Sequence, residues 1–212
     1  MICRDTRKDY TYFEKYISDQ EKRITRFENI RTKLSAEDKI KECDGILSNL
    51  QRNMFLAKFS AGYLIGDLIS SFNTYIDQLI LAKDVSYDEL INAIAINIVL
   101  DAGRNKDLSV LASNNENDVL TKALLGMPGE ERQLIYESNY ESFYQFLTDS
   151  ISETEFIRYI TEDWYDSCED LYWYDSLKSD NDTYVGYWCW IAAAVLKLKN
   201  KSTENVYIPS IV

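Results

Sequence analysis

The sequence predicts an all-α protein: a multi-helix bundle of about seven to nine helices with a short extended C-terminal tail. Apolar residues make up 46% of the 212 residues, which is enough to bury a sizeable core. Only 2 prolines and 7 glycines interrupt the chain, so helices can run long. Apolar residues recur with a period near 3.6 in several segments, whereas no pair of alternating strands joined by a hairpin turn is recognisable.

The first expected helix covers about residues 8–32. Its apolar side chains follow the helical period: Tyr10, Phe13, Tyr16, Ile17, Ile24, Phe27 and Ile30. Lysines and arginines occupy the other face, but aspartates and glutamates are interleaved with them. This mixture favours a solvated face over a patch that binds nucleic acid.

A long helical stretch is expected next, from a capping box formed by Ser35 and Asp38 to about Lys83. Apolar residues surround its second half on nearly all sides, which is typical of a helix at the centre of a bundle. Three glycines interrupt the stretch: Gly45, Gly62 and Gly66. It is therefore either two helices or one kinked helix, and at Gly62 we favour close packing over a backbone contact with a ligand.

Residues typical of helix ends predict the next two helices. Ser86 and Glu89 form a second capping box, which opens a helix to about Asp101. Residues 115–118 cap a short helix that stops at Gly126. The expected boundary between two regions, residues 1–112 and 116–212, lies between these helices.

Three more elements complete the expected bundle. One helix covers about residues 137–148, and a third capping box, Ser152 with Glu155, starts a helix to about Tyr174. A last helix covers about residues 183–199, and residues 206–212 form the extended tail. We expect the two regions to pack as one compact unit.

Charge and aromatic residues are distributed unevenly between the two regions. Residues 1–115 carry 16 Lys and Arg against 17 Asp and Glu, whereas residues 116–212 carry 7 against 18. All four Trp and ten of the sixteen Tyr lie in the second part. Such an acidic region would repel phosphates, so no nucleic-acid partner is expected. The charge indicates either plain solubility or a partner with a basic surface.

Several classes of chemistry lack their usual residues. The chain contains no histidine, so it has no Ser-His or Cys-His nucleophile pair and no imidazole metal ligand. No Gly-rich phosphate loop and no C-x-x-C motif is present. We therefore expect no catalytic residues, no metal and no cofactor.

The chain begins without a secretory signal, and no stretch is apolar enough to cross a membrane. Its four scattered cysteines are typical of reduced thiols. We therefore expect a cytoplasmic protein without a membrane partner.

The expected helix over residues 155–174 carries the candidate binding face. At about 100° per residue, one side gathers the apolar residues Ile157, Ile160, Trp164, Cys168, Leu171 and Tyr174. The opposite side gathers acidic residues and one tryptophan: Glu162, Asp163, Asp166, Glu169, Asp170 and Trp173. Two interpretations stay open. The face is simply solvated, or its carboxylates meet the Lys and Arg of a partner around Trp173 as the buried contact.

Two segments of the chain resemble a known family. The start resembles the opening of the PoNi immunity proteins in Arg4, Asp5, Lys8, Tyr12, Phe13, Tyr16 and Ile17. The segment Phe59-Ser60-Ala61-Gly62 is similar to an aromatic-Ser-x-Gly pattern of the same family. The C-terminal part resembles its second conserved region in Gly186, Tyr187, Trp188, Trp190, the three alanines 192–194, Leu196 and Pro209. The chain departs from the family pattern in ending soon after Pro209.

This resemblance implies a function that periodicity does not indicate. PoNi proteins are helical immunity partners of PoNe toxins, which are DNases that secretion systems deliver between competing bacteria. The resemblance implies that this chain binds and neutralises a cognate nuclease without catalysis. The shared residues are expected to serve packing more than contact with the toxin, because most are apolar.

Two other functions remain open at this point. The chain could be an acidic regulator or DNA mimic that binds many basic proteins weakly, or a helical enzyme that uses carboxylates. A toxin gene next to its own gene would favour immunity, whereas a metabolic operon would favour an enzyme. The sequence indicates neither the oligomeric state nor which toxin is bound.

Overall fold

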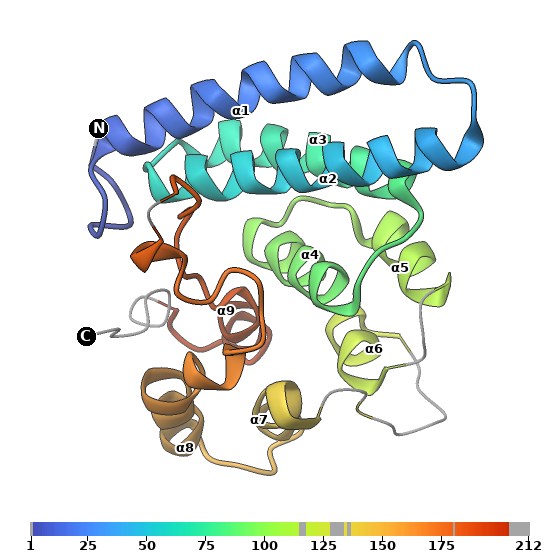
Figure 1. The fold of residues 1–212 in the computed structure, drawn as a ribbon. Helices are drawn as coiled ribbons and strands as arrows, with labels where there is room; N and C mark the ends of the chain where they lie inside the picture. Colours follow the sequence, from blue (N-terminus) through green and yellow to red (C-terminus); the bar gives the residue numbers. More distant parts are fainter. Residues whose placement is uncertain (1, 115–117, 128–133, 135–136, 180, 204–212) are drawn as a thin grey trace. The chain divides into compact units, whose positions relative to one another are not determined.

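The computed structural model describes residues 2–114, 118–127, 134, 137–179 and 181–203 (Figure 1). Within these ranges the chain forms nine α-helices, short π- and 3-10-helical turns, and no strand. The predicted all-α fold with seven to nine helices is confirmed. The predicted tail at residues 206–212, including Pro209, lies outside the described residues.

Packing divides the chain into two units. Unit 1 comprises the described parts of residues 1–86 and 180–186, and unit 2 those of residues 87–179 and 187–212. The boundary predicted from composition, between residues 112 and 116, lies inside unit 2. It stays a prediction that the regions before and after it differ in the charge and aromatic content of their surfaces.

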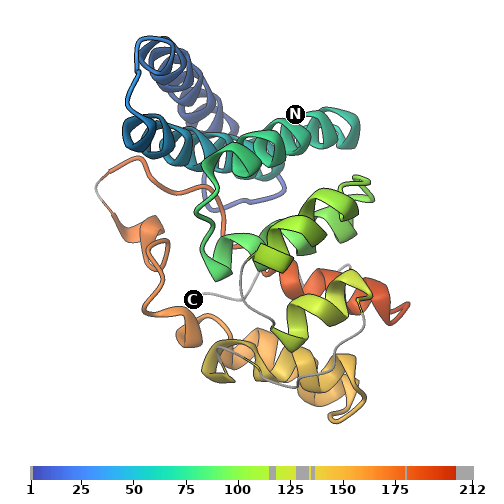
Figure 2. The same ribbon diagram turned by 90° about the vertical axis from the view of Figure 1, so that its right-hand side faces the viewer.

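Unit 1 contains three long helices, α1 (Tyr10–Arg31), α2 (Glu37–Ser60) and α3 (Ile65–Ala82), and α2 packs against both others (Figures 1 and 2). The Asp9 carboxylate caps α1 by accepting a hydrogen bond from the Tyr12 backbone N–H at 2.8 Å. The predicted capping box of Ser35 and Asp38 is wrong. The residue before α2 is Ala36, and no side chain caps that end.

The long stretch is two helices, separated at Gly62. The Gly62 N–H donates to the Phe59 carbonyl and the Tyr63 N–H to the Lys58 carbonyl, both at 3.1 Å. Together with the positive φ of 90° at Gly62, this is the Schellman arrangement that ends helices. Gly45 and Gly66 lie within α2 and α3 and do not break them.

Two distant chain segments meet the C-terminal end of α2 in unit 1. The Arg4 guanidinium donates to the carbonyls of Phe59 at 2.9 Å and Tyr63 at 2.8 Å, and so satisfies groups that the helix end leaves open. The Ser60 hydroxyl donates to the Val185 carbonyl at 2.6 Å. These bonds dock the N-terminal segment and the segment 181–186 on the same helix end.

Asp5 links these two segments from a fully buried position. Its carboxylate accepts a hydrogen bond from the Tyr184 hydroxyl and lies 3.5 Å from the Arg7 guanidinium. Burial and the hydrogen bond to Asp5 raise the pKa of Tyr184, so its hydroxyl stays protonated and donates. A buried carboxylate needs such partners, because burying an unpaired charge is costly.

A buried carboxylate also joins the three helices of unit 1. Asp44 of α2 accepts two hydrogen bonds from the Arg31 guanidinium of α1. The Gln78 amide of α3 donates to the Asp44 carboxylate at 3.2 Å and to its backbone carbonyl at 3.3 Å. We expect Asp44→Ala to lower the free energy of unfolding by about 2 kcal/mol, because it leaves two donors without their acceptor.

Urea unfolding of the Asp44→Ala variant measures this loss. Asp19→Ala is the control, because Asp19 pairs with Lys22 in an exposed bridge and its removal should change little. Equal unfolding midpoints for the two variants would show that the Asp44 network contributes nothing to stability.

Unit 2 is built around α4 (Tyr87–Leu100) and α9 (Trp190–Leu198), which pack against each other. Residues 190–196 of α9 are all buried, and three consecutive alanines allow a close approach. The other helices surround this pair: α5 (Asn105–Asn114), α6 (Val119–Leu125), α7 (Glu137–Leu147) and α8 (Glu153–Arg158) (Figure 2).

Of the short helices of unit 2, one was not predicted and one was predicted at both of its ends. The helix α5 was not expected, although Leu108, Leu111 and Ala112 follow a helical period and are buried. The cap of α6 was expected. The Asp118 carboxylate accepts from the Thr121 N–H at 2.8 Å, and Gly126 ends the helix with a φ of 64°.

The last helix was predicted to start at about residue 183, which is too early. Residues 183–189 are not helical, and α9 begins only at Trp190. Gly186 has a φ of 106°, which no α-helix contains. The backbone carbonyls of Tyr184 and Val185 accept hydrogen bonds from Tyr12 and Ser60 instead of forming helical bonds.

Candidate functional site

The segment that carries the predicted binding face begins as expected. The Ser152 hydroxyl accepts from the Glu155 N–H at 3.3 Å, and the Glu155 carboxylate accepts from the Ser152 N–H at 2.8 Å. This reciprocal capping box starts α8. The Ser152 hydroxyl also donates to the Glu155 carboxylate at 2.6 Å, and this bond, together with the one from the Ser152 N–H, lowers the pKa of Glu155 because both favour its ionised form.

The single helix expected over residues 155–174 is wrong. After Arg158 the chain forms a π-helical turn at Tyr159–Asp163, closed by a hydrogen bond of 2.8 Å from the Trp164 N–H to the Tyr159 carbonyl. A 3-10 turn at Asp166–Cys168 and further tight turns follow. The two opposite faces expected of one straight helix therefore do not exist.

An aromatic cluster replaces that helix. We use this name for Trp164, Tyr165, Trp173, Tyr174 and Tyr187. Trp164 and Trp173 stack with ring centroids 5.8 Å apart, and Tyr165 stacks on Tyr174 at 4.5 Å. Tyr187 completes the cluster, 5.2 Å from the Tyr165 ring and 5.8 Å from the Trp173 ring. Trp173 thus lies on the same side as Trp164, contrary to the prediction.

Hydrogen bonds hold the turns around the aromatic cluster. The Tyr187 hydroxyl accepts from the Leu177 N–H at 2.7 Å. The Tyr165 hydroxyl donates to the Asp175 carboxylate at 3.0 Å and accepts from the Asp175 N–H at 3.1 Å. Burial raises the pKa of Tyr165, which keeps the hydroxyl protonated. The turns are therefore fixed by rings and by hydroxyls together.

Asn139 of α7 attaches this segment to the rest of unit 2. Its side-chain amide donates to the Ser167 carbonyl at 2.7 Å, and its backbone carbonyl accepts from the Tyr159 hydroxyl at 3.3 Å. Burial raises the pKa of Tyr159 to about 12. The roles of Asn139, Tyr165 and Tyr187 as supports of the site were not predicted, because their partners lie 10 or more residues away along the chain.

Five predicted site residues form what we call the acidic surface: Glu162, Asp163, Asp166, Glu169 and Asp170. All five side chains are exposed. No described Lys or Arg lies within ion-pair distance of any of them. Asp166 accepts a hydrogen bond from the Tyr174 hydroxyl at 3.4 Å, which connects the surface to the aromatic cluster. The sixth predicted residue, Trp173, is half-buried and stacks on Trp164.

The residues of the family motifs lie in both units. Arg4, Asp5, Phe13, Gly62 and Gly186 belong to unit 1, where Asp5 and Phe13 are fully buried. Tyr187, Trp188 and Trp190 belong to unit 2 and are also buried. Such burial is typical of packing residues.

Two further searches concern only the described part of the chain. No three of its Cys, Asp or Glu side chains are grouped so that they could hold a metal ion. None of its helices combines the length and the apolar character needed to cross a membrane.

The fold and the site together define an all-helical protein with an exposed acidic surface whose five carboxylates form no ion pair within the described chain. Residues 116–205 match the family model described as PoNe immunity proteins (PoNi), C-terminal. The predicted resemblance to the PoNi family is confirmed over this range, which includes the acidic surface and the aromatic cluster. No curated protein and no solved structure matches the chain.

Proposed function

We propose that this chain is an immunity protein that binds and neutralises a cognate PoNe-type nuclease toxin delivered by a bacterial secretion system. The match of residues 116–205 to the PoNi C-terminal family carries this proposal. The chain acts by binding and not as an enzyme, and it needs no cofactor. It works in the cytoplasm, because the DNA that the toxin attacks lies there.

The acidic surface is the proposed contact with the toxin. A DNase holds the phosphates of DNA on a basic surface, and a protein with the opposite charge complements that surface. The five carboxylates have no internal basic partner within the described chain, so contact with the toxin breaks no ion pair. The aromatic cluster beneath them keeps their backbone in place, which lowers the entropy cost of binding.

Coexpression tests the proposal directly. The nuclease domain of a PoNe-type toxin is produced in a sensitive strain, with and without this chain. We expect growth only when the chain is present, and inhibition of DNA cleavage by the purified chain at about one chain per nuclease. Growth arrest in both strains would reject the immunity function, whereas equal binding to unrelated basic proteins would indicate a general acidic regulator.

Salt should slow the encounter of the two proteins. Long-range attraction between exposed charges is screened beyond about 10 Å at 0.1 M salt and beyond about 3 Å at 1 M. We therefore expect the association rate constant to fall about tenfold or more between these salt concentrations, while the dissociation rate changes less. Stopped-flow fluorescence measures both rates. An association rate that does not change with salt would contradict electrostatic attraction by the acidic surface.

A further inference from the structure

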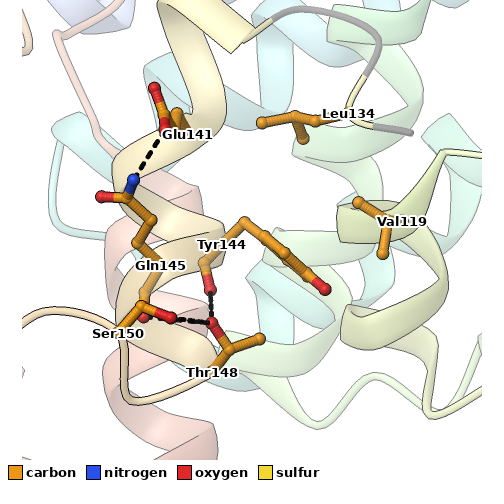
Figure 3. Close-up of a pocket in the computed structure, with 7 residues that line it drawn as sticks. All are labelled: Val119, Leu134, Glu141, Tyr144, Gln145, Thr148 and Ser150. Atoms are coloured by element: carbon orange, nitrogen blue, oxygen red, sulfur yellow. Dashed lines mark hydrogen bonds between the residues drawn. The ribbon is translucent and has the colours of Figure 1, made fainter. Parts of the chain in front are cut away.

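A cavity of about 500 Å³ lies beside α7 in unit 2 (Figure 3). The ring of Tyr144 extends from α7 towards Val119 of α6, and Leu134 lies on the same side of the ring. Polar groups from Thr148 and Ser150 line the opposite part, with a hydrogen-bond distance of 3.0 Å between the two hydroxyl oxygens. The cavity therefore offers an aromatic face, aliphatic walls and hydroxyl oxygens.

Glu141 gives this cavity a negative charge. Its exposed carboxylate accepts a hydrogen bond from the Gln145 amide at 2.6 Å, and no described Lys or Arg pairs with it. The neighbouring acids differ in this respect. Asp149 pairs with Lys199, and Glu153 pairs with Lys201 at 2.7 Å. Among these three acids only the one that lines the cavity lacks a cationic partner within the described chain.

We propose that the cavity receives one Lys or Arg side chain from the nuclease partner. The cationic end pairs with Glu141 and lies against the Tyr144 ring, whose face attracts cations. The methylene groups of the side chain pack on Val119 and Leu134, as long basic side chains pack their stems on apolar surfaces. An acidic side chain would be repelled by Glu141, and a purely apolar one would cover that carboxylate without compensating its lost hydration.

This inference rests on the proposed function and adds a second contact, outside the acidic surface. The stem of the inserted side chain is buried against the Tyr144 ring, Val119 and Leu134, and short-range contacts of this kind slow dissociation more than they speed association. The cavity therefore contributes mainly to how slowly the complex dissociates, whereas the acidic surface contributes mainly to how fast it forms.

The test compares the affinity of two variants with the same change of charge. Glu141→Gln removes the carboxylate of the cavity, and Glu28→Gln removes an exposed carboxylate of α1 in unit 1. We expect Glu141→Gln to weaken binding of the nuclease domain about tenfold or more, through faster dissociation, and Glu28→Gln to have little effect. Tyr144→Phe should bind like the parent, because it keeps the ring, whereas Tyr144→Leu should bind more weakly.

A probe that needs no toxin separates the two proposals. N-acetyl-arginine amide is titrated into the full chain and into Glu141→Gln, and nuclear magnetic resonance follows the Tyr144 ring signals. Shifts that occur in the parent and are lost in Glu141→Gln support the cavity site even if the nuclease does not bind. The inference is overturned if both Gln variants bind nuclease equally well, or, where no nuclease binds, if the probe leaves the Tyr144 signals unchanged.

Discussion

Replacing Gly62 with alanine is expected to lower the free energy of unfolding by about 3 kcal/mol or more. Gly62 has a φ of 90°, a conformation that costs an alanine about 1–3 kcal/mol. A β-carbon at this position would also lie 2.2 Å from the Ile2 carbonyl oxygen, a backbone atom that cannot move alone. The N-terminal segment would have to shift, although Arg4 and Asp5 bind the Ser60 carbonyl through their backbone N–H groups at 2.8 and 3.1 Å.

Gly45→Ala is the matched control for Gly62→Ala. Gly45 lies inside α2, and a β-carbon there meets no atom within 4 Å. Alanine favours helix more than glycine does, so this variant should gain up to about 1 kcal/mol. Urea unfolding followed by circular dichroism measures both variants. If they unfold at the same urea concentration, the close approach at Gly62 does not constrain the fold.

Helix ends show where short sequence patterns suffice. Ser152 with Glu155 forms the predicted capping box, whereas Ser35 with Asp38 does not. Ser152 occupies the cap position directly before α8, with Glu155 three residues later, whereas Ala36 and not Ser35 occupies the cap position before α2. The C-terminal end of α6 at Gly126 was equally predictable, since glycine adopts a positive φ without strain.

Aspartate and asparagine residues with a positive φ follow three other helices, and this signal was not used in predicting the helix ends. Asp101, Asp149 and Asn200 all have φ values between 52° and 60°, directly after α4 and near the ends of α7 and α9. These residue types tolerate the left-handed conformation better than most others. Their presence after an apolar periodic segment is a signal that sequence reading can apply.

Tertiary packing explains why the single helix predicted over residues 155–174 does not form. Its apolar residues do follow a helical period, and this supported the prediction. Acidic residues three or four positions apart, such as Glu162 with Asp166 and Asp166 with Asp170, repel one another on a helix. The stacking of Trp164 on Trp173 and the contacts of both Tyr165 and Trp173 with Tyr187 give the folded-back chain an alternative.

The composition of the candidate site was therefore predictable, but its geometry was not. The sequence alone indicated a cluster of carboxylates with aromatic residues in the second half of the chain. The position of Trp173 depends on Tyr187, which is 14 residues away and follows the non-helical segment 183–186. No local pattern encodes this contact, because the two rings come from segments that are separate along the chain and Gly186, directly before Tyr187, has a φ of 106°.

The half-burial of Trp173 also decides which variants test the toxin-binding surface. Trp173→Ala would remove ring contacts to Trp164, Tyr165 and Tyr187, so it would disturb the support of the surface as well as any contact with a toxin. The carboxylates of Asp166 and Glu169 are exposed and make no ion pair within the described chain. Reversing their charge therefore changes the acidic surface and keeps every ring contact of the aromatic cluster, while it removes the hydrogen bond of 3.4 Å from the Tyr174 hydroxyl to Asp166.

The double variant Asp166→Lys, Glu169→Lys is expected to inhibit the nuclease about 100-fold less well than the parent. It places two positive charges where the basic surface of the nuclease approaches, and like charges at an interface cost several kcal/mol. The control, Glu21→Lys with Glu28→Lys on the exposed face of α1, changes the net charge of −12 by the same amount. A DNA-cleavage assay with increasing amounts of each variant measures inhibition, after circular dichroism has shown that both variants fold. If both double variants inhibit the nuclease equally weakly, the toxin responds only to overall charge. If Asp166→Lys, Glu169→Lys inhibits as strongly as the parent, the toxin contacts another surface.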